Sequence, residues 1–416
     1  MTNKLITIAL VCTYFFSLFT FPGDDRVLDV NSWRLFLFSI LNFVSLTFIF
    51  FESTLFQYFK EAIKSKVSIV IALYFLWALS SYFYAINPTE VLVRSTYIIN
   101  FYISLIVFYA FLRFLNVSKN QIAIFFLISA IIHLLPSYSN YLTIVQVEPY
   151  NNNFNKEIMG FYFNRNITSI NNLFHLQFTL YLILNSKNVL IRVVSVLVSF
   201  LILYLTFILA SRAAIILLIL LSSFYLLSLI IEKRKLKDIL KTQFGVLSIS
   251  LILAFFLSIS NLGADSSANP INRISSITVE EQSTNGRLRY YEQSSDLFFK
   301  SPIIGLGLGS WKIKSVDTDK ENILSYVIPY TVHNDFLENA VELGLIGLIL
   351  FMLIFYYPVK YSISDYFKSN DPFTLCLIAI MIIYLVDSNL NFPAIRASQL
   401  FFLAIFINLI YYKKNI

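Results

Sequence analysis

The sequence predicts an all-α membrane protein with about twelve membrane-spanning helices, and three observations lead to this fold class. Of its 416 residues, 57% are hydrophobic and only 13% are charged. An ordinary soluble domain carries about 25% charged residues, so this chain lacks the polar side chains that cover a water-facing surface. Apolar runs of about 20 residues, the length that crosses a hydrocarbon core, recur along the whole chain. Because backbone amides find no water inside lipid, such runs have to form helices.

Twelve runs meet this criterion, and mostly short polar connections separate them. The predicted spans are residues 4–21, 33–51, 67–86, 96–115, 121–136, 167–185, 189–209, 213–231, 243–259, 338–357, 373–387 and 396–411. The first run follows Lys4 as a secretory signal would, but residues 17–22 lack the small-residue cleavage pattern of a signal peptide. We therefore expect a retained first helix and a single transmembrane domain over residues 1–416.

The distribution of Lys and Arg predicts that both termini are cytoplasmic. With the N-terminus inside, every inside connection carries at least two basic residues, whereas the first outside connection is acidic, with Asp24, Asp25 and Asp29. Basic residues in short loops mark the cytoplasmic side of a membrane. This asymmetry explains the net charge of +7, which indicates contact with anionic lipid headgroups rather than with nucleic acid.

Two outside connections, about 137–166 and 260–337, are too long to be simple turns. Long connections with helical patterns of their own are usually functional. The spans contain few ionisable residues, whereas a transporter places its working charges inside the helices near the bilayer midplane. We therefore expect the chemistry at the outer membrane surface. Two Cys and three His cannot supply a clustered zinc site, and no metal or cofactor is expected.

The large connection contains two segments with separate predictions. Residues 284–292 begin an amphipathic helix, in which Arg289 can pair with Glu292 while Arg287 has no carboxylate at that spacing. Residues 305–309 are Gly-Leu-Gly-Leu-Gly. Such a run either aims backbone amides at an anion or makes a tight re-entrant turn, and the sequence leaves both interpretations open.

His333 is the only histidine outside the apolar runs, which makes it the candidate proton acceptor. An imidazole, with a pKa near 6.5, can take a proton at neutral pH. The other two histidines lie in apolar helices and are expected to be buried structural residues. Asn334, Glu338 and Glu342 follow at four-residue steps. They form either a functional polar stripe at the interface or a solvated helix face.

One further site precedes the large connection. Ser211 and Arg212 join the seventh and eighth spans at the outer surface, where Ser211 can cap the eighth helix. The free amides of a helix N-terminus beside a guanidinium form a strong site for phosphate oxygens. The alternative is an Arg side chain that extends to the lipid headgroups.

Several short motifs occur in a fixed order along residues 160–395. They are GFYFNRN at 160–166, SR at 211–212, NGR at 285–287, KSPIIGLG at 300–307, HNDFL at 333–337 and ELGLIG at 342–347. No single motif is specific, but the ordered set resembles the O-antigen ligase and O-antigen polymerase superfamily. The resemblance covers residues 160–395, and the twelve-span layout extends it to the whole chain.

The resemblance implies a glycosyltransferase-C-like fold in the bacterial inner membrane, with a large, partly helical periplasmic loop over residues 260–337. The donor would be a glycan on undecaprenyl pyrophosphate, and the acceptor would be a hydroxyl of another glycan or of the lipid A-core. The catalytic residues of the family correspond to Arg212, Arg287 and His333. The two guanidiniums would stabilise the pyrophosphate, and the imidazole would act as the base. One base and no covalent nucleophile predict inversion without a metal.

The same resemblance and the local patterns provide the remaining candidates. Asp335 or Glu338 would orient His333. The predicted substrate-binding residues are Asn285, Arg289, Asn334, Asp335, Glu338, Gly305, Gly307, Trp311 and Arg165.

Three alternatives remain open at this point. The motifs do not separate a polymerase, whose acceptor is another lipid-linked repeat, from a ligase, whose acceptor is the lipid A-core. A polysaccharide flippase or solute permease would instead show internal inverted repeats, broken helices and midplane charges. A non-catalytic membrane scaffold is the third alternative. A chain-length regulator is a possible protein partner of the enzyme.

Overall fold

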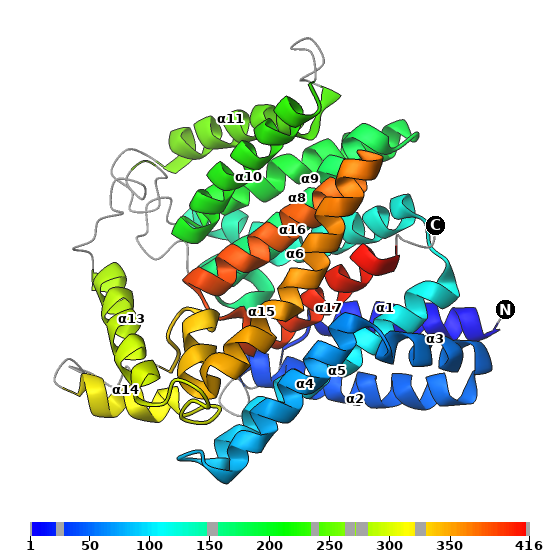
Figure 1. Ribbon diagram of the computed structural model, residues 1–416. Helices are drawn as coiled ribbons and strands as arrows, with labels where there is room; N and C mark the ends of the chain where they lie inside the picture. Colours follow the sequence, from blue (N-terminus) through cyan, green and yellow to red (C-terminus); the bar gives the residue numbers. More distant parts are fainter. Residues whose placement is uncertain are drawn as a thin grey trace. The chain divides into compact units, whose positions relative to one another are not determined.

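The computed structural model describes residues 2–21, 29–147, 157–233, 241–262, 271, 282–320 and 330–412. Over these ranges the regular structure is helical and contains no strand, as predicted (Figure 1). The chain divides into two compact units. Unit 1 comprises Met1–Asn116, Val279–Lys368 and Tyr384–Ile416, and unit 2 comprises Val117–Thr278 and Ser369–Ile383.

Unit 1 is built around α5, a long helix that α1, α2, α3, α4 and α17 contact. Its helices are α1 Thr2–Ser17, α2 Val30–Phe51, α3 Ser53–Ile63, α4 Lys66–Ser80, η1 Ser81–Phe83, α5 Pro88–Leu115, α13 Gln282–Lys300, α14 Trp311–Asp319, α15 Asp335–Ser369, η4 Pro393–Ile395 and α17 Ala397–Tyr412. Its core includes a stack of buried rings, in which Phe38 and Phe401 lie 4.8 Å apart. Tyr14 and Phe108 pack on the ring of Phe401. Aromatic packing of this kind joins the first, second, fifth and last helices.

Unit 2 is built around α8, in which every residue from Thr168 to Leu182 is buried. Its helices are α6 Lys119–Val147, η2 Gly160–Tyr162, α8 Arg165–Asn185, α9 Val189–Ile208, α10 Arg212–Ile231 and α11 Gln243–Leu262. The helices α6, α9, α10 and α11 all contact α8. The first part of α16, Pro372–Leu390, also belongs to this unit, and the rest of that helix belongs to unit 1.

Nine helices of the described ranges are long and apolar enough to cross a membrane, which confirms the membrane fold class. They are α2, α4 with η1, α5, α6, α9, α10, α11, α15 and α16. The other three predicted spans coincide with α1 and α17, each 16 residues long, and with α8, which carries buried polar residues.

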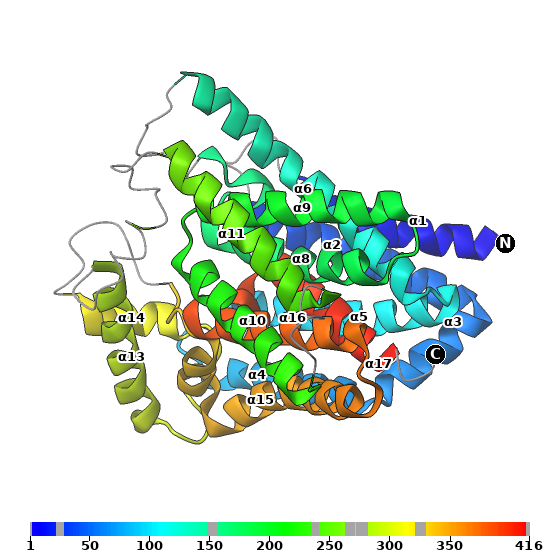
Figure 2. The ribbon, with the colours of Figure 1, turned by 90° about the horizontal axis from the view of Figure 1, so that it is seen from above.

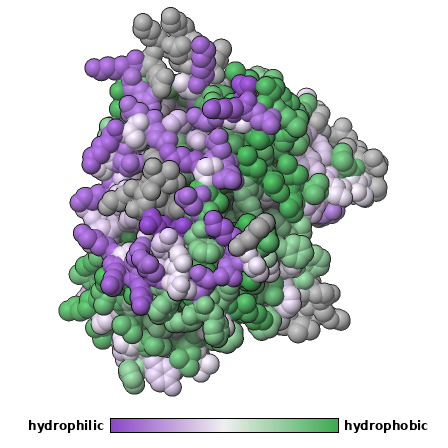
Figure 3. Space-filling view, turned by 90° about the vertical axis from the view of Figure 1, so that its right-hand side faces the viewer, coloured by the Kyte–Doolittle hydropathy of each residue, from purple (hydrophilic) through white to green (hydrophobic). Residues whose placement is uncertain are grey.

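Side-chain exposure agrees with helices that face lipid. Phe43 on α2 is 72% exposed and Phe256 on α11 is 67% exposed, because hydrocarbon rather than water is the solvent for such faces. Figure 3 shows the side on which both chain ends lie in Figure 1. Hydrophilic side chains gather there beside hydrophobic ones.

Helix boundaries differ from the predicted spans in several places, and α15 continues to Ser369, beyond the predicted end at 357. The helix α5 begins at Pro88, earlier than predicted, because Asn87 caps it and proline suits the first helical position. The helix α6 continues through Pro136 to Val147, so the prediction of a connection beginning at 137 was wrong. A separate amphipathic helix, α3, occupies a segment that was predicted to be a simple inside connection.

The predicted large connection is partly helical, as expected, with α13 and α14 inside it. Figures 1 and 2 both show these two helices beside the first turns of α15. Residues 263–270, 272–281 and 321–329 of this connection lie outside the described ranges.

Candidate functional site

The helix α15 is broken at Gly344, and the glycine-rich loop fills the break. Gly344 has φ 65° and ψ −167°, far from helical values. Leu345 donates its amide to the Pro302 carbonyl at 2.8 Å, and Leu306 donates to the Val341 carbonyl at 2.9 Å. A broken helix leaves backbone groups without partners, and the loop supplies partners for them.

Glycine is required on both sides of this junction. A Cβ on Gly305 would lie 2.4 Å from the carbonyl carbon of Glu342, and a Cβ on Gly344 would lie 2.2 Å from the carbonyl oxygen of Ile303. The amide of Gly307 donates to the Glu342 carbonyl at 2.7 Å. The run therefore forms a tight turn whose amides bond within the protein. Substrate binding by Gly305 and Gly307 stays a prediction.

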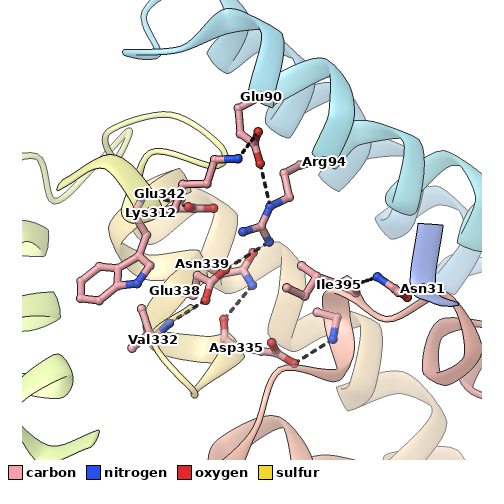
Figure 4. A network of polar contacts seen from close by, with 12 residues as sticks. Asn31, Glu90, Arg94, Lys312, Val332, Asp335, Glu338, Asn339, Glu342 and Ile395 are labelled. Carbon is pink, nitrogen blue, oxygen red and sulfur yellow. Dashed lines mark hydrogen bonds and ion pairs between the residues drawn. The ribbon is translucent and has the colours of Figure 1, made fainter. Parts of the chain in front are cut away.

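A buried chain of charges links three helices of unit 1 (Figure 4). Lys312 on α14 pairs with Glu90 on α5. Arg94, one turn along α5, lies 3.4 Å from Glu90 and 3.3 Å from Glu338 on α15. The second oxygen of Glu338 accepts the Val332 amide at 2.9 Å. Buried charges need partners of this kind, and here the pairing fixes the segment before α15.

The first turns of α15 are buried rather than solvated. Glu338 and Glu342 are 5% and 2% exposed, and Glu342 Oε1 accepts the Trp311 amide at 3.0 Å. The interpretation of these residues as a solvated helix face is therefore wrong. Asn334 caps the helix by accepting the amides of Phe336 and Leu337, at 3.0 and 3.1 Å.

Asp335 fastens α15 to the segment between α16 and α17. Its Oδ2 accepts the Ala394 amide at 3.1 Å, and its carbonyl accepts Asn339 Nδ2 at 2.7 Å. Asn339 in turn accepts the Tyr74 hydroxyl from α4. The segment 332–335 is thus held by α5, α4 and the C-terminal part of unit 1.

His333 lies at the centre of this framework in a left-handed conformation, φ 61°. Its ring contacts the edge of the Phe392 ring, with centroids 5.0 Å apart. Its Nδ1 is buried and has no hydrogen-bond partner among the described residues. Burial, together with the charges of Arg287 and Arg396, lowers the pKa of His333 to about 4. Its imidazole is therefore neutral at pH 7.

Neither predicted orienting carboxylate bonds to the His333 ring. Asp335 and Glu338 accept backbone amides of Ala394 and Val332, so they hold the backbone around the imidazole. The absence of a carboxylate contact means that an imidazolium at His333 would need its counter-charge from a bound anion.

The helix α13 brings Arg287 into the same site. Arg287 and Tyr291 are four residues apart and share a helix face. The Tyr291 hydroxyl lies 3.3 Å from the His333 carbonyl and 3.1 Å from the Asn389 carbonyl. Arg289 lies on another face, 5.6 Å from the ring of Tyr290. Asn285 is in α13, but its side chain lies outside the described part of the chain.

Trp311 is a packing residue of this unit. Its side chain is fully buried and packs in a small core with Leu297, Val332 and Val341. The Tyr290 ring contacts the indole edge at a centroid distance of 6.3 Å. This arrangement ties α13 and α14 to α15, and substrate binding by Trp311 stays a prediction.

In unit 2, two helix N-termini meet, and each begins with arginine. Ser211 caps α10, as predicted, with its Oγ 3.4 Å from the Ala214 amide. The same hydroxyl donates to Asn166 Oδ1 at 2.9 Å, in the first turn of α8. Arg212 and Arg165 are the first residues of α10 and α8. The aligned amides of two helix N-termini, each beginning with an arginine, favour an anion.

Sequence reasoning missed the segment 387–396, which lines the His333 site through Asn389, Phe392 and Arg396. The available signal was an arginine at the very start of the last predicted span, much as Arg212 directly precedes the eighth span. It also missed Arg94, which lay in a predicted outside connection.

Within the described ranges, no group of three or more His, Cys, Asp or Glu side chains could hold a metal ion. The carboxylates around α15 are occupied by backbone amides and by Arg94. At His333 a ring nitrogen without a partner in the described part of the chain lies under the positive charges of Arg287 and Arg396, so the site suits an anion.

Comparison with known protein families finds one match in the part of the chain that contains these residues. Residues 196–352 match a family described as O-antigen ligase. The matched range extends from α9 into α15 and includes Arg212, Arg287, the glycine-rich loop and His333. No curated protein matches the chain.

Proposed function

Because the chain belongs to the O-antigen ligase and polymerase superfamily, we propose that it transfers a lipid-linked glycan to a sugar hydroxyl. The donor is a glycan on undecaprenyl pyrophosphate, and the reaction occurs at the periplasmic face of the bacterial inner membrane. The observation that carries this proposal is the placement of Arg287 beside His333. A cation and a neutral base in one site are what transfer from a pyrophosphate carrier requires.

The reaction is a single displacement with inversion at the anomeric carbon. The acceptor oxygen forms a bond to that carbon while the bond to the pyrophosphate oxygen breaks and its electron pair stays on the pyrophosphate. His333 takes the hydroxyl proton, and Arg287 stabilises the negative charge that develops on the leaving group. These side chains perform the reaction without a metal.

Anion binding also strengthens the base. In the free protein, Arg287 and Arg396 contribute to the low pKa of His333. A bound pyrophosphate offsets these positive charges and raises that pKa, because an adjacent negative charge favours the imidazolium. The donor therefore supplies the counter-charge that no carboxylate of the site provides.

Arg212 and Arg165 have the same chemistry in unit 2. Their helix N-termini, joined through Ser211 and Asn166, support a second role in phosphate binding by Arg212. Asn334 and Arg289 are further proposed contacts for the sugars. The lipid bilayer surrounds the helices and holds the polyprenyl chain.

Glycan transfer by purified protein in detergent tests this function. We expect His333→Ala and Arg287→Ala to lower the turnover rate by about 10² to 10³-fold, the usual effect of losing a catalytic base or charge-stabilising donor. The control is Lys314→Ala, which removes only an exposed ion pair with Asp317. Unchanged transfer by both site variants would refute the catalytic assignment.

A deletion strain separates the two acceptors. Single repeats on lipid A-core would identify a polymerase, since the ligase of the strain still works. Long undecaprenyl-linked chains beside bare core would identify a ligase. Normal surface glycan in the deletion strain would contradict both assignments.

A further inference from the structure

Residues 389–396, from the last turn of α16 to the residue before α17, form one wall of the His333 site. Tyr291 bonds the Asn389 carbonyl at 3.1 Å, Asp335 bonds the Ala394 amide at 3.1 Å, and Asn334 contacts the Asn389 side chain at 3.4 Å. These contacts come from α13, which carries Arg287, and from the start of α15, which begins just after His333. The segment lies beyond the matched residues 196–352.

Arg396 is the charged side chain of this wall. Its guanidinium carbon lies 4.3 Å from the centroid of the Phe392 ring. The His333 ring contacts the same phenyl ring at 5.0 Å. The Phe392 ring thus contacts both the imidazole and the guanidinium. A guanidinium that stacks on an aromatic ring keeps the N–H groups at its own edge available for hydrogen bonds.

The backbone around Arg396 is fixed on both sides by one side chain of α2. Asn31 Nδ2 donates to the Ile395 carbonyl at 2.9 Å (Figure 4). Asn31 Oδ1 accepts the Ala397 amide at 2.8 Å. A pre-positioned arginine loses little conformational freedom when it binds a ligand.

No side chain of the described part of the chain uses these N–H groups. The Arg396 guanidinium is half-buried, and no hydrogen bond or ion pair within 4.0 Å engages it there. Asp387 and Asp29 attract it only from a longer distance, and burial lowers its pKa to about 10, so it stays charged at pH 7. A half-buried cation whose charge acts on His333 together with that of Arg287, and whose donors are unused, suits an anion with several oxygens.

We propose that Arg396 is a further catalytic residue, whose guanidinium binds the donor pyrophosphate together with Arg287. This inference rests on the proposed glycan transfer. As the bond between the anomeric carbon and the pyrophosphate oxygen breaks, the electron pair moves to that oxygen, and both guanidiniums stabilise the charge. The acceptor proton goes to His333.

Glycan transfer and inhibition by inorganic pyrophosphate test the role of Arg396. We expect Arg396→Ala to lower turnover by about 10² to 10³-fold and to weaken pyrophosphate inhibition about tenfold, as the loss of one charge-assisted contact predicts. Arg396→Lys should recover part of both effects, since it keeps the charge without the planar fork. The matched control is Arg113→Ala. Arg113 lies in the last turn of α5, and its Nη2 is 4.0 Å from Glu61 Oε2.

Removal of Arg396 should also raise the pKa of His333, so the acid limb of kcat/KM should move to higher pH in Arg396→Ala. This shift reports the charge of Arg396 at His333, whereas the weaker pyrophosphate inhibition reports its contact with the anion. Turnover within about threefold of wild type, or a lower rate with unchanged pyrophosphate inhibition, would overturn the inference.

A direct measurement of inorganic pyrophosphate binding to purified protein distinguishes failure of the proposed glycan transfer from failure of the proposed role of Arg396. If wild type transfers no glycan, the proposed function fails, while pyrophosphate binding that Arg396→Ala abolishes would still support the anion site. If wild type transfers glycan and Arg396→Ala binds pyrophosphate normally, only the role of Arg396 fails. Gel filtration of Arg396→Lys provides the comparison if the alanine variant does not fold.

Discussion

At His333, we expect local charge to set the pH range of the proposed glycan transfer. A general base works when it is deprotonated, so the rate rises with pH through its pKa. Since the pKa of His333 in the free protein is about 4, we expect kcat/KM to be level above about pH 5. Bound pyrophosphate raises that pKa, so the acid limb of kcat should lie at higher pH. Transfer rates at low and saturating donor concentration measure the two limbs, and coinciding limbs would contradict donor-assisted activation of the base.

Glu338 provides a second prediction at the scale of single residues. Glu338→Gln keeps an oxygen for the Val332 amide but removes the charge that faces Arg94. Loss of one partner of a buried pair costs about 3–5 kcal/mol. We expect a value near the lower limit because Glu90 still pairs with Arg94. Thermal unfolding in detergent measures this loss.

The exposed pair of Lys314 and Asp317 is the comparison for Glu338. Lys314→Ala should change the free energy of unfolding by about 1 kcal/mol or less, because water screens both charges. Equal losses for the two variants would show that burial of the Arg94 network does not control stability.

At the scale of elements, the break in α15 depends on the close contact between two backbones. Gly344→Ala would place a Cβ 2.2 Å from the Ile303 oxygen, at φ 65°. We expect a strongly lowered melting temperature and lost transfer, since neither backbone can move without breaking the loop hydrogen bonds. Gly286→Ala in α13 is the matched control, because nothing lies within 4 Å of its Cβ position. The control should keep its stability or gain about 0.5–1 kcal/mol from better helix propensity. A similar loss of stability in both variants would contradict the proposed dependence of the break on close backbone contact.

The link between α2 and the end of the chain gives another prediction. Asn31→Ala removes the bonds to the Ile395 carbonyl and the Ala397 amide. Arg396 then becomes less ordered, so we expect the donor KM and the inhibition constant of pyrophosphate to rise while the fold persists. Asn31→Asp keeps the acceptor for the Ala397 amide, so its donor KM and inhibition constant should lie between those of the wild type and of Asn31→Ala. Steady-state kinetics at varied donor concentration measure these constants for the three proteins. A fall in kcat alone, with unchanged KM, would contradict the prediction.

At the scale of the whole molecule, we expect the charge asymmetry to determine the orientation in the membrane. Lys320 lies in the predicted periplasmic connection, and Lys64 lies in a predicted cytoplasmic one; both are exposed. In a Cys12→Ser background, Lys320→Cys should react with an impermeant maleimide in intact spheroplasts, whereas Lys64→Cys should react only after lysis. Replacement of Cys12 is needed because this thiol is exposed, unlike that of Cys376. The reverse labelling pattern would place the His333 site in the cytoplasm.

The sequence by itself determined the helical membrane fold, because span length and apolar content are properties of contiguous residues. All twelve predicted runs lie on helices. The motifs around Arg287, Gly305 and His333 could also be found in the sequence, because each consists of contiguous residues. The helix ends were less predictable, because α5, which Asn87 caps, and α6 both extend beyond their apolar runs.

Only the tertiary structure decided which polar groups meet. Arg94 and Glu338 are 244 positions apart, and Asn31 and Ala397 are 366 positions apart. Many pairings of scarce charges satisfy the same hydropathy pattern, so the pattern cannot select one of them. The choice is made by helix packing, which buries Glu338 and Glu342 with their backbone partners and leaves the donors of Arg396 unused beside His333.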